Sequence, residues 1–330
     1  MKKYSIKNFA GLLLIVFATI LTSCDRNLLE TLPNDRLSEG VFWKTKTDAK
    51  LAVNALYTDL DDVNIVSWDA LTDIVHTNQS FNVQAYIELG THDATNSKIY
   101  EEWKKAYVGI RATNYFLENV DKINSANGTL INQFKGEAKV LRAYQYIKLA
   151  GFFGDVPLIT TPISIAEGQS IQRTPVAEVW RFVANELNEA AQLLPKTYAA
   201  TEKGRITQGA ALGLLARAEL YAGNYQKSAE AAEQVITSGV YGLHDSYEKL
   251  FSYAAENSKE VLLDKQFIKD TYSNNIFQEL APYSQKNSNS TFVPTKVIVD
   301  AFETSQGKSI SEAGSGYNPA KPYENRDSRL

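Results

Sequence analysis

The sequence predicts a mostly α-helical fold of antiparallel helical hairpins, with a loop-rich part and little β structure. Three observations lead to this prediction. Apolar residues recur at spacings of three and four in several long segments before residue 240. Two of these segments are joined by a tight turn at Gly223-Asn224-Tyr225, as in a helical hairpin. From Thr271 to Gly316, serine, asparagine and glycine dominate, which is typical of loops.

The first segment of the chain has the pattern of an export signal. Lysines precede an apolar run from Phe9 to Leu21 that contains no charged residue. This run falls short of the roughly 20 apolar residues that span a bilayer, and it fits the apolar region of a signal peptide. We therefore expect the mature chain to leave the cytoplasm.

Cys24 is the only cysteine in the 330 residues, so it cannot form a disulfide within the chain. Leu21-Thr22-Ser23-Cys24 resembles the lipobox of bacterial lipoproteins. That resemblance implies a signal peptide over 1–23, a diacylglyceryl thioether on Cys24 and an acyl chain such as palmitate on the new amino terminus. Several acyl chains make a stable membrane anchor. The alternative is an ordinary signal-peptidase site that leaves Cys24 as a free thiol.

After the anchor, residues 24–37 lack periodicity and are predicted to be a tether. Loss of residues 1–23 removes three lysines and no acid, which moves the net charge from −4 to −7. An acidic chain argues against nucleic acid as a partner.

Six helices are predicted in the order 45–60, 101–121, 131–150, 174–194, 207–222 and 226–237. Apolar residues cover more than half the circumference of the third, so we expect it to be buried, with Arg142 paired to a carboxylate. Thr174 is expected to cap the fourth helix with Pro175 as its first residue. Gly239 is expected to terminate the sixth.

The hairpin of the last two helices has a specific turn. Gly223-x-Tyr225-x-x-Ser228 resembles the turn of a tetratricopeptide repeat, and alanines along both helices allow close packing. Such hairpins stack into an α-solenoid. Irregular stretches at 61–100 and 152–173 interrupt the array, and residues 260–267 are predicted to form a strand.

Several stretches together resemble the SusD/RagB family of outer-membrane nutrient-binding lipoproteins. They are Leu37–Trp43, Gly136–Tyr144, Phe153–Leu158, Arg173–Pro175, Arg205–Ala211 and Glu324–Leu330, the last with Ser328 where the family usually has proline. The resemblance implies a SusD-like α-solenoid with tetratricopeptide-like units over 38–240. It implies that 241–330 is the truncated start of the family's C-terminal region, because family chains continue well past this point.

The resemblance also implies a function. The protein is expected to be a lipoprotein of the bacterial outer membrane, facing the exterior. It is expected to bind oligosaccharide and to deliver it to a SusC-like TonB-dependent transporter, without catalysis and without a cofactor. The alternative is a tetratricopeptide-type scaffold that binds peptide or protein at the outer membrane.

The candidate ligand-binding residues lie in the loop-rich stretches, because sugar recognition needs flat aromatic faces ringed by polar side chains. They are Trp68, Asp73, Asn78, Phe81 and Tyr86 in the first stretch and Tyr283, with Phe292, in the second. The alternative is that Trp68 and Phe81 plug the end of the solenoid while the polar residues are solvated.

Catalytic and metal signatures are missing from the sequence. It contains no His-Glu-x-x-His, no Gly-x-Ser-x-Gly and no phosphate-binding loop, which argues against a hydrolase. Asp59, Asp61 and Asp62 could together hold calcium, but three acids at the end of a helix are more often solvated. No metal site is therefore predicted.

Overall fold

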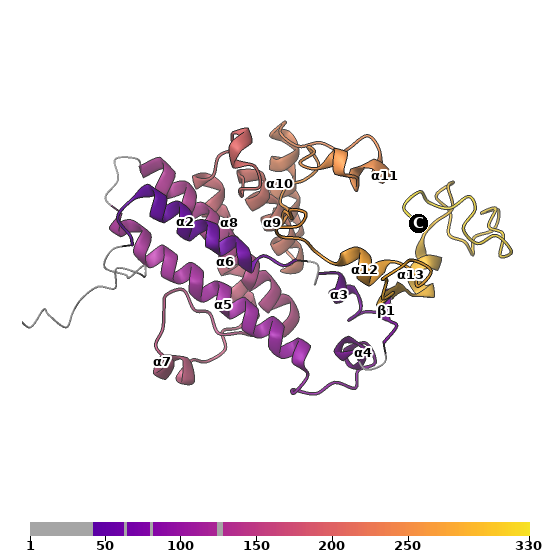
Figure 1. The fold of residues 1–330 in the computed structure, drawn as a ribbon, viewed down its shortest axis with the longest axis horizontal. Helices are drawn as coiled ribbons and strands as arrows, with labels where there is room; N and C mark the ends of the chain where they lie inside the picture. Colours follow the sequence, from indigo (N-terminus) through magenta and orange to yellow (C-terminus); the bar gives the residue numbers. More distant parts are fainter. Residues whose placement is uncertain (1–41, 63–64, 80–81, 124–127) are drawn as a thin grey trace, which may run out of the picture. The chain divides into compact units, whose positions relative to one another are not determined.

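The computed structural model describes residues 42–62, 65–79, 82–123 and 128–330, so Cys24 and Phe81 lie outside the described residues. The chain divides into two units at Lys44–Thr45, and the fold described below is that of residues 45–330. This unit is mostly helical with little strand, as predicted (Figure 1). No helix within its described residues combines the length and the apolar character needed to cross a membrane.

Six long helices form the helical array. They are α2 (Lys46–Leu56), α5 (Ser97–Asn119), α6 (Gly128–Phe153), α8 (Val176–Leu193), α9 (Gln208–Tyr221) and α10 (Tyr225–Thr237). Helix α6 is central and contacts α2, α5 and α8, while α9 packs between α8 and α10. As the apolar pattern predicts, α6 is largely buried, and Tyr146 and Leu149 on it are fully enclosed.

The remaining elements are short. The helices are α3 (Val66–Asp69), α4 (Val83–Glu88), α7 (Ile165–Ser170), α11 (Tyr247–Leu250), α12 (Ile276–Leu280) and α13 (Lys296–Ala301). Single 3₁₀ turns are η2 (Tyr57–Asp59), η4 (Val120–Lys122), η5 (Ala200–Glu202) and η6 (Tyr253–Ala255). The strands are β1 (Val75–Thr77) and β2 (Phe292–Pro294), which pair antiparallel.

The turn of the α9–α10 hairpin has the predicted geometry. Gly223 has φ +78°, a backbone conformation that favours glycine. The hydroxyl of Ser228 donates to the carbonyl of Ala216 across the hairpin at 2.8 Å, so this small residue does face back onto α9. Gly239, with φ +68°, follows the end of α10 as predicted.

The predicted cap of α8 is wrong by one residue. Pro175, not Thr174, is the boundary residue, and its ψ of 137° is not helical. The backbone of Thr174 instead pairs with Val156 in an isolated antiparallel bridge. The first N–H of the helix, that of Val176, donates to Oδ1 of Asp155 at 2.8 Å. A residue distant in sequence therefore supplies the cap, because the bridge holds Thr174 in an extended conformation.

The predicted strand over 260–267 is also wrong. A strand needs a hydrogen-bonding partner, and this segment instead runs over the helices. The side chain of Leu262 lies against Gly213, leaving no room for a Cβ there. The ammonium of Lys265 donates to the carbonyls of Thr58 and Leu60, at 3.2 and 2.7 Å. The segment is thus held by side-chain contacts rather than by a ladder.

Candidate functional site

The short β ladder joins the two loop-rich stretches in which the sequence placed the candidate residues. Thr77 on β1 lies opposite Phe292 on β2. Just beyond the strands, the N–H of Asn78 donates to the carbonyl of Thr291 at 2.8 Å. In Figure 1, β1 lies beside α12 and α13, although these elements are distant in the sequence. We call residues 65–79, 82–96 and 276–295 the joined-loop surface.

Two candidate tyrosines are exposed on the joined-loop surface. Tyr86 projects from α4 with 47% of its area exposed, and Tyr283 follows α12 with 66% exposed. Among the described residues, no hydrogen bond is recorded for either hydroxyl. Both rings and both hydroxyls are therefore available to a ligand.

The loop that carries Tyr283 is held by one carboxylate. Glu279 on α12 accepts hydrogen bonds from the hydroxyl of Thr291 at 2.5 Å and from the amides of Asn275 and Asn289 at 3.1 and 3.2 Å. These bonds close the loop between α12 and β2. The position of Tyr283 is thus fixed by the same segment that pairs with β1.

Trp68 is directed inward rather than toward solvent. Its indole Nε1–H donates to Oε1 of Glu102 at 3.2 Å, and its ring meets the edge of Phe152 with centroids 5.3 Å apart. The ammonium of Lys148 lies 5.1 Å from the centre of the ring. The observed contacts of Trp68 are those of a residue that supports the fold under the joined-loop surface.

Asp73 and Asn78 also contribute to holding the surface together. The backbone carbonyl of Asp73 accepts from the hydroxyl of Thr295 at 2.6 Å. The amide of Asn78 donates to the carbonyl of Ser290 at 3.3 Å. Both residues are exposed, and neither the carboxylate of Asp73 nor the amide oxygen of Asn78 has a recorded partner within the described part of the chain, so a ligand could reach either group.

A buried group of charges lies beneath Trp68. Lys98 and Lys148 approach Glu102 at 2.8 and 3.2 Å, and Lys148 also pairs with Asp61 at 2.8 Å. Burial raises the pKa of Glu102, but its two lysines and Trp68 outweigh burial and hold this pKa below its ordinary value. Asp61 is thus used in an internal ion pair. In the described ranges, no cluster of three or more metal-binding side chains is found.

Arg142 has the carboxylate partner that the sequence predicts. Its Nη2 and Nε lie 2.6 and 2.9 Å from Oε2 of Glu186, and its Nη1 donates to Oδ1 of Asn114 at 2.8 Å. The pair joins α6 to α8 and α5. Arg142 is therefore a structural residue.

A second buried carboxylate joins two stretches on which the family resemblance rests. Glu137 on α6 is fully buried and accepts from Nη1 of Arg205 and the hydroxyl of Tyr57, both at 2.7 Å, and from the hydroxyl of Tyr198 at 3.2 Å. Burial raises the pKa of Glu137 even though Arg205 opposes the shift. The sequence showed both motifs but not that they contact each other.

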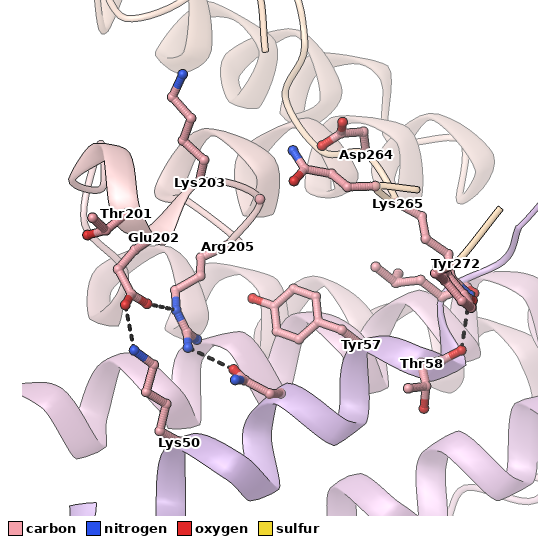
Figure 2. Close-up of a pocket in the computed structure, with 14 residues that line it drawn as sticks. Lys50, Tyr57, Thr58, Thr201, Glu202, Lys203, Arg205, Asp264, Lys265 and Tyr272 are labelled. Atoms are coloured by element: carbon pink, nitrogen blue, oxygen red, sulfur yellow. Dashed lines mark hydrogen bonds and ion pairs between the residues drawn. The ribbon is translucent and has the colours of Figure 1, made fainter. Parts of the chain in front are cut away.

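A cleft of about 520 Å³ lies in front of Arg205 (Figure 2). It is bounded by α2 and η2, by the turn at 201–205, and by the segment 264–272. Sequence reasoning missed it because its walls come from three separate segments. The single signal in the sequence was the pair of aromatic residues Phe267 and Tyr272, close together in a loop.

The fold and the exposed loops define a helical-hairpin protein with a loop-rich surface. A model of the SusD-like family, described as starch-binding associating with the outer membrane, matches residues 29–220, more than half of the chain. The chain belongs to this SusD-like family.

Individual relatives agree with the assignment. A SusD-like protein of Formosa agariphila is 28% identical over 248 residues, which are 72% of this chain and 47% of that protein. A SusD-like protein of Bacteroides fragilis has a similar structure, with a TM-score of 0.79 at 25% identity over 90% of this chain and 62% of its own. A laminarin-binding SusD-like protein aligns with a TM-score of 0.62 at 26% identity, over 67% of this chain and 51% of its own. The chain spans about half the length of the curated relatives it matches.

Proposed function

We propose that this protein binds oligosaccharide nutrients at the joined-loop surface, without catalysis. The observation that carries the proposal is the pair of exposed rings, Tyr86 and Tyr283, on loops that the β1–β2 ladder holds in place. Flat rings pack against the apolar face of a sugar, and adjacent hydroxyl, amide and carboxylate groups bind its hydroxyls. Membership of a family described as starch-binding, and likeness to a laminarin-binding protein, support carbohydrate as the ligand.

The polar contacts of the surface would come from groups the fold leaves unused. The carboxylate of Asp73 accepts hydrogen bonds from sugar hydroxyls, and the phenol hydroxyls of Tyr86 and Tyr283 donate and accept. Trp68 acts behind them by supporting the loops, and Asn78, besides its bond to Ser290, keeps its amide oxygen for a ligand. Phe81, a candidate from the same stretch of the sequence, lies outside the described residues.

The proposed cellular role follows from the anchor. Acyl chains on Cys24 hold the protein on the outer membrane, facing the exterior, and residues 24–37 tether the helical part to them. A SusC-like TonB-dependent transporter then receives the sugar. The family's described association with the outer membrane supports this arrangement.

A binding experiment tests the site. Isothermal titration with oligosaccharides selected on a glycan array should give a measurable affinity, and Tyr86→Ala and Tyr283→Ala should each weaken it about tenfold, because each removes one stacking ring. Tyr225→Ala is the control, since Tyr225 is also exposed, at 71%, but lies on α10 and not on these loops. Unchanged affinity in both loop variants excludes this surface, and absence of binding to any glycan excludes the function.

A fractionation experiment tests the anchor. Cells that express the protein should incorporate labelled palmitate into it and keep it in the outer-membrane fraction. Cys24→Ala should abolish the label and release the protein or leave it uncleaved. Label that survives the substitution contradicts lipidation at Cys24. Co-purification of a large β-barrel transporter with the wild-type protein tests the proposed partner.

A second candidate function is peptide binding by the helical array. A groove of about 730 Å³ lies between α8, α9 and α10. On its wall the rings of Trp180 and Tyr221 meet edge to face, with their centroids 6.1 Å apart. Such a groove between helices can take an extended peptide. Retained capture of peptides by a protein that binds no glycan, together with loss of capture in Trp180→Ala, would favour this function.

A further inference from the structure

The cleft in front of Arg205 is separate from the residues of the joined-loop surface and has its own chemistry. Figure 2 shows charged side chains on both of its sides with Tyr57 between them. Its volume of about 520 Å³ is within the range of small-molecule sites. Its charged lining residues are Lys50, Lys203, Arg205, Lys265, Glu202 and Asp264.

One wall is a chain of ion pairs in which the protein already uses the acceptors. Oε1 of Glu202 is paired with Lys50 and Oε2 with Nε of Arg205, both at 2.5 Å. Oδ1 of Asn54 accepts from Nη2 of Arg205 at 2.7 Å. The groups that remain for a ligand are donors, namely the other hydrogens on the ammonium of Lys50 and the amide NH₂ of Asn54. This wall therefore favours a ligand that brings acceptors.

The opposite wall carries a cation and a ring. The ammonium of Lys265 donates two hydrogen bonds to backbone carbonyls. Its nitrogen lies 5.9 Å from the centre of the ring of Tyr272. Within the described residues, Lys265 has no carboxylate at ion-pair distance, although its charge interacts at longer range with that of Asp59. One of its hydrogens is left for a ligand.

The ring of Tyr272 is held in position. It stacks on Phe267 with centroids 5.3 Å apart and planes 6° from parallel. Its backbone exchanges two hydrogen bonds with Ile268, at 2.8 and 2.9 Å, which closes a tight turn. Tyr272 is 48% exposed and lines the cleft, whereas Phe267 does not line it. Phe267 therefore backs a ring that remains accessible.

The charge of the cleft is opposite to that of the chain. Of its four cationic lining side chains, Arg205 is paired with the buried Glu137, which leaves three cations against the two lining carboxylates in a chain whose net charge is −4. Asp264 is exposed and has no recorded hydrogen bond in the described ranges, so it can accept from a hydroxyl. The cleft thus combines excess positive charge, one free carboxylate and one flat ring.

We propose that this cleft binds a negatively charged sugar residue of a glycan. The sugar ring packs on Tyr272, its hydroxyls donate to Asp264, and its anionic group lies near Lys265 and is attracted by Lys50 from across the cleft. The anion is a carboxylate, as in a uronic acid, or a sulfate ester. This inference rests on the proposed glycan-binding function and adds a second site and a ligand class to it.

Calorimetry with the full chain purified in detergent tests the inference. The probes are trigalacturonate, a sulfated galactose trisaccharide and neutral galactotriose. We expect at least one charged trisaccharide to bind on the order of tenfold more tightly than the neutral one, with an affinity that falls as salt is raised. Preference for the uronate or for the sulfated sugar identifies the source of the charge.

Substitutions locate the site. Tyr272→Ala should weaken binding of the charged trisaccharide by about tenfold, and Tyr272→Phe should retain it, because the ring is what packs on the sugar. Lys50→Gln should weaken it by about two- to fivefold, as expected for one exposed charge pair. Lys249→Gln, which changes an exposed lysine on α11 outside both the cleft and the groove, should have no effect.

The outcomes separate this inference from the proposed function. Equal or tighter binding of the neutral sugar, or full affinity in both Tyr272→Ala and Lys50→Gln, overturns the cleft proposal. If Tyr86→Ala then removes glycan binding, the joined-loop site stands alone. If none of the three trisaccharides binds while a glycan from the array does, the cleft proposal fails and the proposed function stands.

Discussion

Replacement of Arg205 by leucine should leave the buried carboxylate of Glu137 without its cationic partner and so destabilise the fold. The side chain of Glu137 is 0% exposed and that of Arg205 is 9% exposed, and 2.7 Å separate their charged atoms. Loss of one partner from a buried pair costs about 3–5 kcal/mol. The hydroxyls of Tyr57 and Tyr198 still donate to Glu137, so we expect about 3 kcal/mol, the lower end of this range.

The stability lost in Arg205→Leu should be larger at high pH than at low pH. Burial already raises the pKa of Glu137, and without Arg205 only the hydrogen bonds from Tyr57 and Tyr198 oppose that shift. Between the ordinary carboxyl pKa of about 4.3 and the raised value, the folded state binds more protons than the unfolded state. Stability therefore increases as pH falls through this window, and the deficit of Arg205→Leu should shrink between pH 8 and pH 5.

Urea unfolding followed by circular dichroism measures the effect. The double variant Glu137→Gln/Arg205→Leu should recover about 1–3 kcal/mol relative to Arg205→Leu and lose its added pH dependence. Lys50→Gln is the control, because it removes an exposed cation from Glu202 and should cost less than about 1 kcal/mol. A deficit that is the same at both pH values and is not rescued by Glu137→Gln would refute the reasoning.

Two further predictions concern stability and are measured by thermal melting. Thr207→Ala should cost about 1 kcal/mol or more, because the side chain of Thr207 caps α9 through the N–H of Ala210 and contacts the hydroxyl of Tyr241. Thr207→Ser keeps the hydroxyl and should cost less. Gly209→Ala should destabilise by roughly 1–3 kcal/mol, because its Cβ would lie 2.1 Å from the ring of Tyr241. Gly151→Ala, also within a helix but with open space around it, should stabilise by about 0.5–1 kcal/mol, and equal melting shifts in the two alanine variants would contradict the close packing at Gly209.

Much of the helical array could be predicted from the sequence because the relevant forces are local. Apolar spacing marked the six long helices, and Thr207 and Gly239 marked two helix ends through bonds within a few residues. The cap of α8 could not be predicted in this way. It depends on Asp155, which reaches Val176 only after the chain has folded back.

The candidate site could likewise be predicted only in part. Composition alone indicated which stretches were rich in rings and amides, and so identified Tyr86 and Tyr283 as candidates. It could not show that β1 pairs with β2, or that the indole N–H of Trp68 is hydrogen-bonded to Glu102. Pairing of strands depends on which segments meet in space, and a side chain's role depends on which of its faces the neighbours cover.

By itself, the sequence determined the class of fold, the lone cysteine after an apolar run, and the motifs that resemble the SusD/RagB family. Tertiary structure alone decided that Glu137 and Arg205 neutralise each other and that three separate segments enclose a cationic cleft beside Tyr272. The physical reason is range. Periodicity and capping act over a few residues, whereas ion pairs and clefts depend on contacts between residues distant in the chain.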